Sequence, residues 1–289
     1  ADRVALDAET GITGIETNVN TLAASTTSGG FSIDNTGALE IGTVDLLSGI
    51  TAAASSIFLT TTGTLLVSDA VTGGAVDLRS NDTMTISDNV AASTGTLKLQ
   101  NNGGDFVVNS PALVSNTGAF LIDIDSAGAV TLDDGSGVMS LGAGLIDIVA
   151  ATDVALATLI TGGNVTVTAT AGAITDNNGA LNNIAAVNAT LTSGGSTGAG
   201  DALETTIAAL EADSGAGLEL DNTGALNIGF GGILTGVAAD AGLTITSTGT
   251  MTVTESVTGS GGTLKLENTA GDFVVNSPAL VSNTGAFLI

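Results

Sequence analysis

Carboxylate side chains supply almost all of the chemistry that this sequence could perform. Asp123 and Asp125 stand on one side of a predicted turn, and Asp133 and Asp134 stand on the other. Oxygen-rich clusters of this kind suit Ca²⁺, which prefers carboxylate and carbonyl ligands. These four residues are therefore the predicted calcium site. The regular Gly/Asp nonapeptide of calcium-loaded β-rolls is missing, so a solvated acidic face is the alternative interpretation.

Paired carboxylates could also belong to a glycosidase or a polysaccharide lyase. Enzymes of the second class generally place Lys, Arg, His or Tyr beside their carboxylates. This chain has no His, Cys, Trp or Tyr, and its only cations are Arg3, Arg79, Lys98 and Lys265. Ser-His-Asp catalysis, a Cys nucleophile and a disulfide framework are therefore excluded. We predict no enzymatic activity, no catalytic residue and no cofactor other than calcium.

The net charge bears on partners as well as on chemistry. Four Lys/Arg against 29 Asp/Glu give a formal charge of -25. A chain this acidic repels nucleic acid, so no nucleic-acid partner is expected. No apolar run reaches the length of about 18 residues that a membrane-spanning helix requires, so we expect no membrane span.

The elements that must position these carboxylates are repeated. Residues Gly262–Ile289 repeat Gly95–Ile122 with three substitutions, which pair Gln100 with Glu267, Asn102 with Thr269 and Gly103 with Ala270. An enzyme rarely needs two near-copies of one segment. A repetitive scaffold does, because each unit buries its apolar face on the next unit.

A longer repeat contains the short one. Asp34-Asn-Thr-Gly-Ala-Leu39 recurs as Asp221-Asn-Thr-Gly-Ala-Leu226, whereas Lys98 recurs as Lys265 at a shorter separation. The difference is about 20 residues, which is the length of a small structural repeat. Because both flanks are intact, this loss indicates the removal of one complete structural unit. We divide the chain into modules of about 13–200 and 201–289, the second incomplete, within one continuous domain over 1–289.

Alternating apolar residues recur at a similar interval and predict strands. Phe31-Ser-Ile33 and Ala38-Leu-Glu-Ile41 flank one polar turn, and Leu243-Thr-Ile245 and Met251-Thr-Val253 flank another. Alternation is typical of half-buried strands, and Asn-Thr-Gly or Ser-Thr-Gly turns tolerate positive φ. The predicted fold is all-β: a parallel β-helix, or β-solenoid, with two strands in each coil of about 20 residues.

One segment of each module breaks the two-residue period. Leu203, Ile207 and Leu210 follow a helical spacing after Asp201-x-x-Glu204, which matches a capping box. Ile15, Val19 and Leu22 do the same after Thr13-x-x-Glu16. We predict one short helix in each module, with an irregular coil as the alternative.

The segment Gly162–Gly229 begins GGNVTVTATAGAITDNNGALNN and ends LELDNTGALNIG. It resembles the repeats of giant bacterial surface proteins of the filamentous-haemagglutinin type, and Glu16–Gly42 carries part of the same unit. The resemblance implies a right-handed parallel β-helix, secretion, and a role in adhesion or extracellular matrix. It brings no catalytic residues.

These observations favour a structural extracellular protein, located outside or on the surface of a bacterial cell. It would be a subunit or segment of a filament, sheath or adhesin. The apolar segment that ends at Ile289 predicts head-to-tail self-association through open terminal coils. A carbohydrate-binding or carbohydrate-degrading β-helix is the alternative function. The sequence does not identify a glycan or surface partner.

Overall fold

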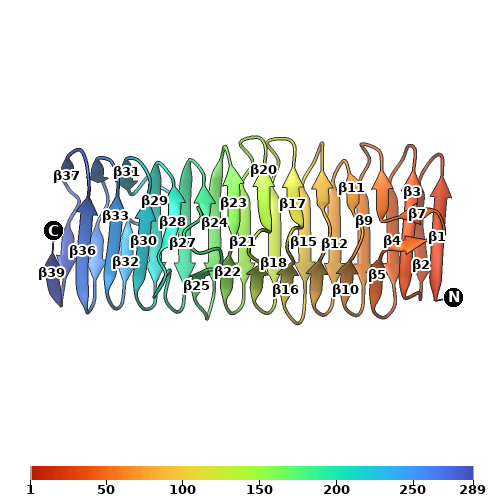
Figure 1. Ribbon diagram of the computed structural model, residues 1–289, viewed down its shortest axis with the longest axis horizontal. Helices are drawn as coiled ribbons and strands as arrows, with labels where there is room; N and C mark the ends of the chain where they lie inside the picture. The colour runs from red at the N-terminus through yellow and green to blue at the C-terminus, as the bar shows by residue number, and fades with distance from the viewer. Residues whose placement is uncertain (1, 289) are drawn as a thin grey trace. The chain divides into compact units, whose positions relative to one another are not determined.

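The computed structural model describes residues 2–288 and divides into two compact units, Ala1–Ile148 and Val149–Ile289. Each unit is a stack of β-coils, drawn from red to green and from green to blue (Figure 1). The two units together make about 13 turns, with coils of roughly 21 residues. No helix occurs within residues 2–288, so none there could cross a bilayer. The predicted β-solenoid is confirmed. Ile289, the residue predicted to join one copy to the next, lies outside the described part.

Most coils of unit 1 have three sides, and each side is a row of parallel strands in register. The first side consists of β2 (Ile12–Thr17), β4 (Phe31–Asn35), β9 (Ile57–Thr61), β12 (Val76–Ser80), β15 (Leu97–Asn101), β18 (Ile122–Ser126) and β21 (Ile146–Ala150). The second consists of β5 (Leu39–Ile41), β10 (Leu65–Val67), β13 (Met84–Ile86), β16 (Phe106–Val108) and β19 (Val130–Leu132). The third consists of β8 (Ile50–Ala52), β11 (Val71–Gly73), β14 (Val90–Ala92), β17 (Leu113–Asn116) and β20 (Gly137–Ser140). The two-strand coil predicted from the sequence is therefore wrong, because it missed the third side.

Unit 2 is built in the same way. Its first rows are β22 (Val154–Leu156) with β25 (Ile174–Asp176); β23 (Thr158–Thr161), β26 (Ile184–Ala185) and β28 (Leu203–Thr206); and β24 (Asn164–Ala169), β27 (Asn188–Ser193) and β29 (Ala209–Ser214). The three rows that follow are β30 (Leu218–Asn222), β33 (Leu243–Ser247), β36 (Thr263–Asn268) and β39 (Ala286–Leu288); β31 (Leu226–Ile228), β34 (Met251–Val253) and β37 (Phe273–Val275); and β32 (Val237–Ala239), β35 (Val257–Gly259) and β38 (Val281–Asn283).

Apolar residues fill the interior in rows because the strands are stacked in register. On the second side of unit 1, one inward residue of each strand pairs with the matching residue of the next strand, and all of these residues are buried. The row consists of Leu39, Leu65, Met84, Phe106 and Val130. Leu226 begins the matching row in unit 2 and is buried as well. Burial of one Leu or Phe side chain contributes about 1.5–3 kcal/mol. Stability therefore accumulates row by row, although the chain has no Trp or Tyr.

The segment missing from the second module corresponds to one coil. In unit 1, three strand-to-strand steps lead from Phe31 through Ile57 and Val76 to Leu97. In unit 2, two steps lead from Leu218 through Leu243 to Leu264. The predicted loss of a whole unit is confirmed by these registers.

The predicted helices are wrong. Leu203 lies on β28 and Leu210 on β29, while Ile207 lies at the corner between these strands, and all three are buried. Asn222 closes this corner from the next coil, because its Oδ1 accepts the backbone N–H of Ile207 at 3.0 Å and the hydroxyl of Thr205 at 2.9 Å.

The first module repeats this arrangement. Asn35 Oδ1 accepts the N–H of Val19 at 3.0 Å and the hydroxyl of Thr17 at 2.8 Å. The corner places inward residues three or four positions apart, which imitates helical spacing. The acceptor that stabilises it belongs to another coil, so local spacing could not show it.

A second special corner lies where one strand forks. In unit 1, β3 (Thr21–Thr26) pairs on one side with β1 (Arg3–Ala8) and on the other with β5 at its start and β8 at its end. The loop between β5 and β8 forms a small antiparallel hairpin of β6 (Thr43–Val44) and β7 (Leu47–Ser48). In unit 2, β29 forks in the same way to β31 and β32.

The two forks are filled by different residues. Ala23 stands at the fork in unit 1, beneath a hairpin in which Val44 is buried. Glu211 stands at the fork in unit 2 and is 0% exposed. Its carboxylate accepts the N–H of Gly232 at 2.6 Å and that of Leu234 at 3.0 Å. One fork is therefore closed by apolar packing, and the other by hydrogen bonds to a buried carboxylate.

We expect Asn222→Ala to lower the stability of the protein by about 1–3 kcal/mol, because the buried N–H of Ile207 loses its acceptor. Chemical denaturation followed by circular dichroism measures the change. Thr223→Ala is the matched control, because Thr223 is the exposed neighbour of Asn222, and it should leave stability almost unchanged. Equal denaturation midpoints for the two variants would contradict the role given to Asn222.

Candidate functional site

The most varied chemistry lies on the outer surface of the first side of unit 1. Parallel strands in register place the outward residues of successive coils about 4.8 Å apart, so they form rows. We call the two central rows the charged face. One row is Ser32, Phe58, Asp77, Lys98 and Asp123, and the other is Asp34, Thr60, Arg79, Gln100 and Asp125. This face holds two of the four cations of the chain.

Asp77 and Arg79 form a rigid pair on β12. The guanidinium donates from Nε to Asp77 Oδ1 at 2.8 Å and from Nη2 to Asp77 Oδ2 at 2.7 Å. Its central carbon also lies 5.3 Å from the centre of the Phe58 ring, which is within range for a cation–π contact. The hydrogen bond to Asp77 is the main cause of the raised pKa of Arg79. The pair thus holds a charged plane against an aromatic ring.

Lys98 bridges two carboxylates of the neighbouring coil. Its Nζ donates to Asp125 Oδ2 at 3.0 Å and also to Asp123 Oδ2. Burial lowers the pKa of Lys98, but the hydrogen bonds to Asp123 and Asp125 together with their negative charges raise it by more, so the net shift is upward. The side chain therefore stays an ammonium and does not act as a base or nucleophile near neutral pH.

Asp147 extends the acidic side of this site from β21. Burial raises the pKa of Asp147, and the negative charges of Asp123 and Asp125 raise it further, while Lys98 opposes the shift. Folding therefore disfavours the ionised form of this carboxyl group.

The structure separates the four predicted calcium ligands into two pairs. Asp123 and Asp125 lie on β18 and share the ammonium of Lys98. Asp133 and Asp134 lie in the turn after β19. Within residues 2–288, no three acidic side chains come together in a way that could hold a metal ion. The geometry of the described residues therefore does not support the predicted calcium site at Asp123, Asp125, Asp133 and Asp134.

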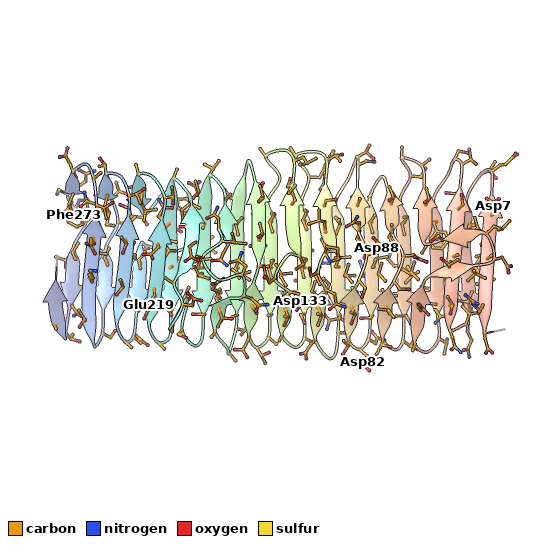
Figure 2. All side chains as sticks on the ribbon, viewed as in Figure 1. Asp7, Asp82, Asp88, Asp133, Glu219 and Phe273 are labelled. Atoms are coloured by element: carbon orange, nitrogen blue, oxygen red, sulfur yellow. The ribbon has the colours of Figure 1, made fainter. Side chains whose placement is uncertain are left out.

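Two further acidic residues, Asp82 and Asp88, lie on either side of β13. Asp82 lies at the tip of a turn at the lower edge of the view, away from Asp88 (Figure 2). Each accepts the N–H of the residue that follows it, Thr83 at 2.8 Å and Asn89 at 2.7 Å. These carboxylates therefore stabilise turns.

Sequence analysis missed Phe58. Its position between Ile57 and Leu59, both buried, shows that it points outward. Its contact with Arg79 depends on the register of β9 against β12, because the two residues are far apart in the sequence. The alternation of Ile57, Phe58 and Leu59 indicates that Phe58 points outward, but no local sequence pattern identifies Arg79 as its neighbour.

Unit 2 contains a buried polar cluster around the turn after β25. The amide of Asn183 donates to Asp176 Oδ1 at 2.6 Å, and its oxygen accepts the N–H of Glu204 at 2.9 Å. Burial raises the pKa of Glu204, with further contributions from nearby carboxylates that include Asp176. The capping-box interpretation of Glu204 is therefore wrong, because this residue lies on β28 and its backbone N–H contributes to a network that stabilises the turn.

Comparisons with known proteins identify no relative. No protein-family model matches the chain, and no curated protein or solved structure matches it significantly. The repeat-adhesin resemblance therefore rests on the sequence, and the β-solenoid architecture that the structure shows is consistent with it.

We expect Asp147→Asn to raise the melting temperature at pH 7, where the native carboxylate is charged beside Asp123 and Asp125. Because the folded pKa is raised, this group favours folding at low pH, and that contribution is lost as the pH rises through the folded pKa. The difference between wild type and variant should therefore vanish below the ordinary Asp pKa of 3.8.

Thermal unfolding at a series of pH values measures this effect. Asp134→Asn, in an exposed position of a turn in the same unit, is the control and should show a smaller change. A variant that is less stable than wild type at pH 7, or a difference that does not depend on pH, would contradict the assignment to Asp147.

Proposed function

We propose that the protein is a structural component of a bacterial cell surface, and that it forms part of a filament, sheath or adhesin without enzymatic activity. The observation that carries the proposal is the coil-by-coil architecture of both units. A module can lose one whole coil while the rows on either side stay in register. Such tolerance suits a protein that acts through an extended surface, because an active site depends on one fixed constellation.

The resemblance to filamentous-haemagglutinin-type repeats supports an extracellular location. The residues that carry it, Gly162–Gly229, form strands from β24 to β31 of unit 2. Absence of Cys is common in bacterial surface proteins, and this chain has none. Both cations of the charged face are paired with carboxylates, which also fits a surface exposed to changing solution conditions.

The proposal includes head-to-tail self-association. Backbone hydrogen bonds between parallel strands join coil to coil within each unit, and the same pairing can join a coil of one copy to a coil of another. Such a contact uses different surfaces on the two copies and therefore propagates into a filament. The charge of -25 opposes close approach of copies, so screening by salt should promote it.

Electron microscopy and immunogold labelling test this proposal. Antibody against the purified protein should label the outer surface of the cells that produce it, and the purified protein should form fibres more readily as NaCl is raised from low concentration. A polysaccharide-cleavage assay should show no new reducing ends. Labelling confined to the cell interior, or reproducible cleavage, would refute the structural role.

A further inference from the structure

The charged face contains a hollow of about 310 Å³ that spans three consecutive coils of unit 1. It lies over the beginnings of β9, β12 and β15, and its lining includes Phe58, Asp77 and Lys98, which are successive members of one outward row. Ser56 and Thr96, which carry hydroxyl side chains, also line the hollow. Apolar surface predominates, with polar groups at defined points. This combination is typical of small-molecule sites.

We infer that this hollow binds a segment of a neutral polysaccharide. One sugar ring would lie against Phe58, and its hydroxyl groups would exchange hydrogen bonds with Asp77, Lys98 and the two neighbouring hydroxyl side chains. This inference goes beyond the proposed structural role and does not depend on it.

The aromatic ring is held in place before any ligand arrives. Asp77 accepts two hydrogen bonds from the guanidinium of Arg79, and the guanidinium lies over the ring of Phe58. Phe58 is half-buried and lines the hollow, whereas Arg79 does not line it. A side chain fixed in this way loses little conformational entropy on binding.

The charges around the hollow favour a neutral ligand over an anionic one. Arg79 is paired with Asp77, and Lys98 is paired with both Asp123 and Asp125. The charged face has four carboxylates and two cations, so it repels uronates, sulfated sugars and nucleic acid. The paired groups still form hydrogen bonds, because Lys98 keeps a third N–H and the oxygens of Asp77 keep free lone pairs. Sugar hydroxyls can use both.

The regular spacing of the coils fits a linear polymer. Phe58, Asp77 and Lys98 repeat along the stack at about 4.8 Å, a distance comparable to the length of one extended hexose unit. Successive sugar units of a polysaccharide that lies along the row would thus contact the Phe58 ring, the Asp77 carboxylate and the Lys98 ammonium group. A single bound monosaccharide would use only one of them.

Isothermal titration calorimetry on the full chain tests the inference. The probes are six-residue neutral oligosaccharides of glucose, mannose and xylose, with an oligouronate of the same length as the anionic comparison. We expect at least one neutral probe to bind in a manner insensitive to NaCl. The oligouronate should not bind.

Phe58→Ala should weaken binding of the neutral probe by about tenfold or more, since the ring contact is lost. Phe58→Tyr should retain it. Phe120→Ala is the matched control, because Phe120 is an exposed phenylalanine of the same unit that does not line the hollow. Circular dichroism and thermal unfolding establish that each variant is folded.

Three results would overturn the inference: no binding of any neutral probe, equal loss of binding in Phe58→Ala and Phe120→Ala, or binding of the oligouronate alone. None of them bears on the surface labelling or fibre formation that test the structural role, so failure of one proposal is distinguishable from failure of the other.

Discussion

Register between parallel coils is the constraint on which the other features depend. A residue on one coil lies directly beside its partners on the coils before and after it, so its neighbours are fixed by the coil length. An inward position must therefore be apolar in coil after coil, as in the row from Leu39 to Val130. Where an inward position is polar, its hydrogen bonds must be made inside the stack. Asn116, for example, donates to the carbonyl oxygen of Gly95 and accepts the N–H of Gly118, both at 2.8 Å.

The same constraint governs the outside, where like charges on neighbouring coils would lie about 4.8 Å apart and repel. The charged face avoids most of this repulsion by alternating sign along its rows, with Lys98 between Asp77 and Asp123. In the second copy of the repeat, Glu267 replaces Gln100 and pairs with Lys265 on its own strand. Each lysine therefore meets a carboxylate, although the partner comes from a different place. Asp147 lies beyond the alternation, and its raised pKa reflects both its burial and the unrelieved repulsion.

The strands that the sequence predicted are those with enough alternation to be visible, such as Phe31–Asn35 and Leu243–Ser247. The third side of the coil was missed because strands such as Val71–Gly73 have a small residue at their second inward position, so they show no apolar alternation. The helices were mispredicted because Asn222 closes the corner at Ile207 from another coil. The contact of Phe58 with Arg79 on the charged face could not be predicted for the same reason, because it depends on the register between two coils. Local patterns predict which residues point inward, whereas contacts between coils require the coil lengths.

The forks at β3 and β29 show how far the chemistry of such a scaffold can vary while its backbone stays the same. The two loops leave and rejoin the coil at matching places, and Gly49 and Gly236 end them with positive φ of 68° and 100°. A Cβ at these glycines would lie 2.0 Å from the carbonyl oxygen of Ala70 or 2.1 Å from that of Ser256 in the next coil, so both positions require glycine. Inside this fixed frame, Ala23 with Val44 is replaced by Glu211 with Gly231. A buried carboxylate alone would cost several kcal/mol. Here the carboxylate of Glu211 accepts the backbone N–H groups of Gly232 and Leu234. These groups belong to the loop in which Gly231 takes the place of the buried Val44. Steric contact between coils therefore fixes the backbone, and the side chains within that frame exchange in compensating pairs.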